Sequence, residues 1–143
     1  MQTISPQEME AKVDARYRVF LILWFALLMS VTLFVVLVLF TGSQGSPNPV
    51  LSYALLAMGV SIVLASFLLK QQLVRKAIDK TDIAALQSAH IISLALCESA
   101  ALFGVLDRFV TASPTSWFLF AIAALGILLN FPSKDNVRAA SFK

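Results

Sequence analysis

The stretch VFLILWFALLMSVTLFVVLVLF, residues 19–40, decides the class of fold. It contains no charged side chain, and as an α-helix it would be about 33 Å long at about 1.5 Å per residue. That length matches the hydrocarbon core of a lipid bilayer, which is about 30 Å thick. We therefore interpret this stretch as a membrane-spanning helix.

The rest of the chain repeats the same pattern. Hydrophobic residues make up 59% of the sequence and charged residues 13%, with a mean hydropathy of +0.83. In soluble domains, about 45–50% of the residues are apolar and about 25% are charged. Further apolar runs cover residues 50–69, 83–106 and 116–131. The sequence thus predicts an all-α, integral membrane four-helix bundle, with a polar segment before it (1–18) and a charged tail after it (132–143).

The polar segments between the runs predict where the helices end. The stretch TGSQGSPNP, residues 41–49, is rich in turn-forming residues and predicts a tight turn. Apolar residues recur beyond Lys70, so we expect the second helix to continue past the membrane. Thr81 or Asp82 is the expected N-cap of the third helix.

The positive charges predict the orientation in the membrane. All but one of the 11 lysines and arginines lie before the first run, between the second and third, or after the fourth; the exception is Arg108. Because positively charged loops stay in the cytoplasm, we expect both termini there and the spans arranged as two antiparallel hairpins. The net charge of +3 arises from these flanking residues, so we expect no nucleic-acid partner. The bilayer of a bacterial inner membrane is the expected location.

The third run, residues 83–106, is unusual because it contains polar side chains. A helix turns by about 100° per residue, which places on one face Gln87, His90, Cys97 and Glu98. A charged carboxylate in the middle of a membrane costs at least about 2.5 kcal/mol, so Glu98 should face protein. We interpret Glu98 either as a structural hydrogen-bonding group or as a candidate proton-binding residue. His90 lies about 12 Å from it along the helix and cannot touch it.

Two side chains of this run bear on cofactors and metals. A membrane histidine such as His90 is chemically suited to ligate a haem or a chlorophyll. Cys97 is the only cysteine, and we interpret it as a packing residue. The sequence shows no Cys/His cluster at metal-site spacing, so we expect no metal.

Small side chains recur at four-residue spacing in the second and third runs. Such ridges let membrane helices approach closely. We therefore expect these two spans to pack together through them, with Glu98 near the edge of the contact. The ridge residues are Ala85, Ala89, Ser93, Cys97 and Ala101 in the third run, and Ala57, Ser61 and Ala65 in the second.

The stretch ALCESAALFGVL, residues 95–106, resembles the proton-carrying helix of the c subunits of rotary ATP synthases, which places an aromatic residue and a glycine five and six residues after its carboxylate. The resemblance implies that Glu98 takes up and releases a proton, with Phe103 and Gly104 packing around it. The chain departs from that family because c subunits have a glycine-rich helix, and the first two spans here contain only Gly59.

The whole pattern of four spans, with ALCESAALFG in the third and Phe131-Pro132 ending the last, is also similar to small bacterial membrane proteins. This resemblance implies the four-span topology and no particular activity.

Three hypotheses for the function remain. The sequence lacks a phosphate-binding loop and a Ser-His-Asp set, so we expect no enzyme. The leading hypothesis is lateral helix packing, with the protein as a homo-oligomer or an accessory, structural subunit of a larger membrane complex. The alternative is a proton or small-ion translocating unit that uses Glu98, with His90 and Gln87 lining the inner half of the route. The second alternative is a haem or pigment bound by His90.

Overall fold

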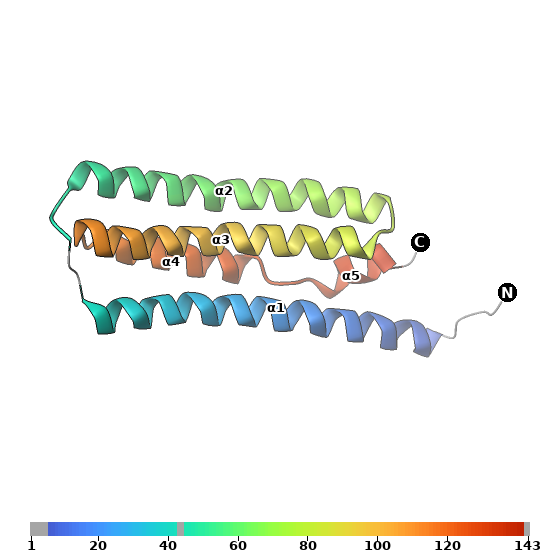
Figure 1. Cartoon of the computed structure of the whole chain (residues 1–143). Helices are drawn as coiled ribbons and strands as arrows, with labels where there is room; N and C mark the ends of the chain where they lie inside the picture. The colour runs from blue at the N-terminus through green and yellow to red at the C-terminus, as the bar shows by residue number, and fades with distance from the viewer. Residues whose placement is uncertain (1–5, 43–44, 142–143) are drawn as a thin grey trace.

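The computed structural model describes residues 6–42 and 45–141, and most of them are helical. Figure 1 shows an elongated bundle in which α1 to α4 run side by side, while α5 lies at the end that also carries both termini. We call this the terminal end of the bundle. Within the described residues the helices are α1 (Pro6–Thr41), α2 (Pro49–Asp79), α3 (Ile83–Thr111), α4 (Ser116–Leu129) and α5 (Lys134–Ser141).

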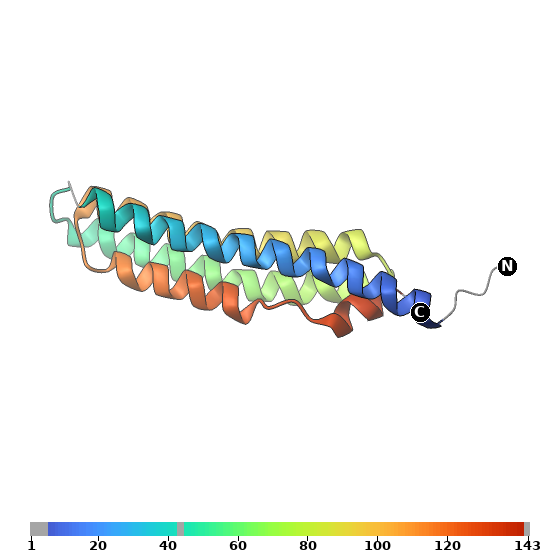
Figure 2. The ribbon, with the colours of Figure 1, turned by 90° about the horizontal axis from the view of Figure 1, so that it is seen from below.

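The helices differ in whether they can cross a membrane alone. Helices α1, α2 and α3 are each long and apolar enough to do so. Helix α4 has 14 residues, or about 21 Å, which is less than the hydrocarbon thickness of about 30 Å. Only together with α5 is it long and apolar enough to cross a membrane. The two helices are bent by 54° relative to each other, and the bend is visible in Figure 2. The bundle therefore has three straight helices of spanning length and one bent pair.

The start of α3 agrees with the sequence prediction. Asp82 is the N-cap, and its Oδ1 accepts hydrogen bonds from the backbone N–H groups of Ala84 and Ala85, at 2.9 and 3.1 Å. Such a cap satisfies N–H groups that have no partner inside the helix. Thr81, the other candidate, instead adopts a left-handed conformation with φ of 53°. Helix α2 also continues well past its apolar run, as predicted.

The polar segments at the two ends of the chain are less separate from the helix bundle than predicted. Helix α1 is one continuous helix of 36 residues that includes most of the expected N-terminal segment. The tail forms α5, which packs against α1, α2 and α3. Val137 and Ala140 of α5 are 1% exposed and share a small core with Val13, Phe20 and Ala77. An apolar face on α5 thus docks the tail on the bundle.

The expected pairing into two hairpins is only partly correct. Helix α3 contacts all four other helices, whereas no contact joins α1 and α2 within the described residues. Figure 1 shows α3 lying between α1 and α2. Small side chains on α3 explain its central place, because they let neighbouring helices approach closely. The first two helices are therefore antiparallel but do not form a packed hairpin.

The small-residue ridge of α3 is buried, as predicted. Ala89, Ser93, Cys97 and Ala101 are each at most 1% exposed, and Ala85 is half-buried. Glycines extend this close packing to α4. A Cβ atom on Gly104 would lie 3.2 Å from a ring carbon of Phe120, so α4 approaches closely there.

The prediction for the ridge of α2 is wrong. Ala57, Ser61 and Ala65 are exposed and do not face α3. Helix α2 instead packs through a different face, whose buried residues are Ser52, Gly59, Val63, Ser66 and Ala77. Gly59 lies on this face, and a Cβ atom there would overlap the tip of the Leu119 side chain, so α4 approaches α2 closely at this point. We call the exposed residues Ala57, Ser61 and Ala65 the outer seam.

Candidate functional site

Glu98 of α3 points toward α1. The hydroxyl group of Ser30 donates a hydrogen bond to Oε1 of Glu98, and both side chains are half-buried. Hydrogen bonds between membrane helices contribute about 0.6 kcal/mol on average. The carboxyl group therefore links α1 and α3 and faces protein, as expected from the cost of exposing a carboxylate to lipid.

Cys97 faces α2 and α4 instead, in a polar cluster that the sequence did not predict. Asn130, the C-cap of α4, is fully buried; its Nδ2 donates to the Gly126 carbonyl at 2.8 Å, and its Oδ1 accepts from Ser93 at 2.9 Å. The Ser66 hydroxyl lies 3.2 Å from Sγ of Cys97. We call these side chains the Asn130 cluster. It joins α2, α3 and α4 through Ser66, Ser93, Cys97 and Asn130.

The predicted polar stripe is therefore divided among several environments. Cys97 and Glu98 are neighbours in the sequence, but a helix turns by about 100° between them, so they face different helices. His90 is 5% exposed and packs edge-on against Phe20, with ring centroids 5.4 Å apart. Gln87 is half-buried. The structure does not bring the members of the stripe together into one site.

A buried carboxylate lies at the other end of α3. Asp107 is 0% exposed, and it accepts hydrogen bonds from the hydroxyls of Thr111 and Thr115, each at 2.6 Å. The Thr115 hydroxyl also pairs with Ser52 of α2. Burying a charge is unfavourable unless it is hydrogen-bonded, so these hydroxyls compensate Asp107. In the sequence Asp107 directly follows the apolar run 83–106, and the two threonines within the next eight residues are the signal that could have identified it.

The surroundings of His90 do not fit a haem or a chlorophyll. Nε2 of His90 is buried and has no hydrogen-bond partner within the described part of the chain. The space beside it is about 10 Å³ and is bounded by Lys70, Ser133 and Asn136, among others. Cofactor sites have volumes of about 300–1,000 Å³. The described residues also include no group of three or more His, Cys, Asp or Glu that could hold a metal ion.

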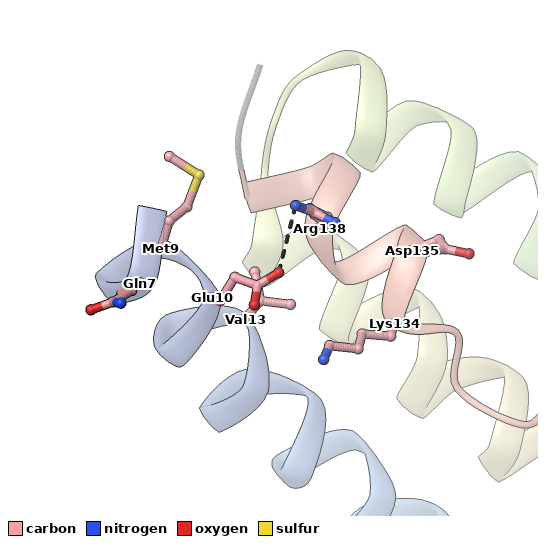
Figure 3. A pocket seen from close by; sticks show the side chains of 7 residues that line it. All are labelled: Gln7, Met9, Glu10, Val13, Lys134, Asp135 and Arg138. Atoms are coloured by element: carbon pink, nitrogen blue, oxygen red, sulfur yellow. Dashed lines mark ion pairs between the residues drawn. The ribbon is translucent and has the colours of Figure 1, made fainter. Parts of the chain in front are cut away.

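A larger pocket lies between the start of α1 and α5, at the terminal end. Its volume is about 570 Å³, and Figure 3 shows the side chains that line it. Arg138 pairs with Glu10 at 3.7 Å, and Lys134 pairs with Asp14 at 2.5 Å. The hydrogen bond from Lys134 to Asp14 raises the pKa of Lys134. Because charges of α1 and α5 neutralise each other here, we assign these side chains to the docking of α5.

Comparison with models of known protein families, with curated proteins and with solved structures found no match.

Proposed function

We propose that this chain is an integral membrane protein with four spans that works by lateral helix packing. It associates either with copies of itself or, as an accessory subunit, with a larger membrane complex. Helices α1, α2 and α3 supply three of the spans, and the apolar run 116–131, which contains α4, supplies the fourth. Both ends of the described chain lie at the terminal end of the bundle, as an even number of crossings requires. The lysines and arginines gathered at that end favour a cytoplasmic location for it.

The observation that carries this proposal is the outer seam of α2. Ala57, Ser61 and Ala65 are exposed, while the buried face of the same helix packs inside the bundle. The Ser61 hydroxyl bonds to the Ala57 carbonyl at 2.7 Å, so it is satisfied within its own helix and leaves the surface flat. Small residues at this spacing let the backbone of a second helix approach closely in lipid. The outer seam is therefore suited to a helix of another chain.

Cysteine cross-linking in native membranes tests this proposal. The natural cysteine is buried, so Cys97→Ser provides a cysteine-free background. In that background we expect Ser61→Cys to cross-link through the outer seam, to a second copy or to a partner. Met29→Cys is the matched control, because Met29 is 45% exposed on α1 and lies outside the seam. Equal cross-linking at both positions, or none at Ser61→Cys, would contradict the proposal.

Proton or small-ion translocation through Glu98 is the second candidate. The observation in its favour is a half-buried carboxyl group in the central helix, hydrogen-bonded to Ser30 of a neighbouring helix. Protonatable residues inside membrane helices commonly mark ion pathways. The test is proton flux into sealed vesicles for the wild type and Glu98→Gln. Flux that is lost in the variant supports the candidate, whereas equal flux, or none from either protein, removes it.

A further inference from the structure

The break between α4 and α5 creates a small cavity inside the terminal end of the bundle. Pro132 lacks a backbone N–H and its ring clashes with the preceding turn, so a helix cannot continue through it. The chain accordingly leaves helical geometry between Leu129 and Lys134. Pro132 is buried, and it bounds the cavity together with residues of α1, α2, α3 and α5. Side chains from distant parts of the sequence therefore meet around one small space.

His90 presents an unsatisfied atom at this cavity. Its side chain is 5% exposed, and Nε2 has no hydrogen-bond partner among the described residues. Buried polar atoms in folded proteins are nearly always paired, with protein or with ordered water. An imidazole nitrogen accepts a hydrogen bond when it is unprotonated and donates one when it is protonated, and a water molecule can act as the partner in either case.

Lys70 lines the same cavity from α2. Its ammonium group has three donors and no acceptor, so it can donate a hydrogen bond to an acceptor held in the cavity. No carboxylate is among the described residues that line the cavity. A molecule that accepts from Lys70 and donates to His90 fits this lining, and water does both.

The size of the cavity selects the same molecule. The space is about 10 Å³, which is about the minimum that holds one water molecule. Ser133 and Asn136 also line it, and because Ser133 is exposed, the cavity borders the outside at the terminal end. Polar surroundings with two to four partners are what a buried water requires.

We propose that this cavity is a binding site for a single water molecule, which accepts a hydrogen bond from Nζ of Lys70 and donates one to Nε2 of His90. The helix break at Pro132 makes the room for it, and Ser133 and Asn136 supply its remaining partners. The site gives water from the terminal end access to the one histidine of the chain. It is independent of the outer seam and of lateral association.

The single histidine makes the test direct, because ¹⁵N-histidine labelling yields the signals of one ring only. Solid-state NMR of the full chain in lipid bilayers measures magnetisation transfer from water protons to the ring nitrogens. We expect transfer to an unprotonated Nε2 in the wild type and its loss in Lys70→Met. Gln71→Met, an exposed position one residue along α2, is the control and should keep the transfer.

Several results would overturn the site. The first is the absence of transfer from water to Nε2 in the wild type. The second is transfer that is unchanged in Lys70→Met. The third is transfer that disappears when chloride in the buffer is replaced by gluconate. The last result would assign the cavity to an anion. If Lys70→Met does not fold, Asn136→Leu fills the same cavity from α5, and the proposal then requires loss of the transfer in that variant.

Discussion

Ser30 and Glu98, which are 68 positions apart in the sequence, are joined by a hydrogen bond from the serine hydroxyl to the glutamate carboxyl. This bond matters for the architecture because α1 makes no contact with the next helix, α2, within the described residues. A second tie runs from the indole N–H of Trp24 to the Ile127 carbonyl, at 2.7 Å. Helix α1 is therefore held to the bundle by specific polar bonds to α3 and α4.

Removing the Ser30 hydroxyl should weaken the attachment of α1. We expect Ser30→Ala to lower the free energy of unfolding in detergent by about 0.6 to 1.7 kcal/mol, the range for hydrogen bonds between membrane helices. Thr32→Val is the control, because the Thr32 hydroxyl bonds only within its own helix, to the Leu28 carbonyl. A loss of stability that is no larger in Ser30→Ala than in Thr32→Val would show that the bond contributes nothing.

A methyl group at Gly126 should disturb the contact between α3 and α4. Its Cβ atom would lie 2.9 Å from Sγ of Cys97 and 3.1 Å from Val63. Overpacking costs about 1–3 kcal/mol and the better helix propensity of alanine returns about 1 kcal/mol, so we expect Gly126→Ala to lose about 1 kcal/mol. The same change in a Cys97→Ala background should be less harmful. Equal losses in both backgrounds, measured as unfolding free energies, would contradict this close contact.

Asp107 should matter for stability although it lies at the end of a helix. Asp107→Asn replaces an acceptor of two hydroxyl hydrogen bonds by an amide, part of which can only donate. Hydrogen bonds to charged groups contribute about 1.5–3 kcal/mol, and we expect a loss of about that size in the free energy of unfolding. Asp135→Asn, at an exposed position of α5, is the control and should change stability little. Similar stability of the two variants would refute the role of the Asp107 carboxylate.

The docking of α5 should depend on pH through Lys134. Its pKa is raised above the ordinary lysine value of 10.5 by the hydrogen bond to Asp14. The stabilisation is therefore fully present below pH 10.5 and is lost as the pH rises through the raised pKa. Spin labels at Lys12→Cys and Ala139→Cys, in the Cys97→Ser background, should show a distance distribution that broadens above that pH. Lys134→Arg should keep it narrow to higher pH, because a guanidinium stays charged.

An unchanged distribution for the parent protein through this pH range would remove Lys134 from the docking of α5. If the distance distribution of Lys134→Arg broadened at the same pH as that of the parent protein, a group other than Lys134 would be responsible for the pH dependence.

The features that the sequence predicted well depend on local chemistry. The long apolar helices follow from uncharged runs, and the Asp82 cap follows from a side chain that bonds to backbone two and three residues later. The buried ridge of α3 follows from small residues at one spacing. Each of these three predictions depends only on residues within a few consecutive turns of one helix.

The structural features that could not be predicted from the sequence depend on which helices pack against each other. Small residues occur on α2 and on α3, but in lipid an outward face is as apolar as an inward one, so spacing could not show that Ser61 faces outward. The Asn130 cluster needs three helices to meet, and the prediction treated the surroundings of Asn130 only as the end of a span. The separation of Cys97 from Glu98 likewise became evident only when the partners Ser66 and Ser30 were placed.

The mass of the purified protein in a mild detergent or nanodisc tests lateral packing most directly. The chain itself has a mass of 15.6 kDa. We expect the wild type to form an assembly heavier than this, with itself or with a co-purifying partner, and Ser61→Leu to reduce it to the monomer. Ala95→Leu, at an exposed position outside the outer seam, should leave the assembly intact. A wild type that is monomeric and binds no partner, or a Ser61→Leu variant with the wild-type mass, would contradict the account.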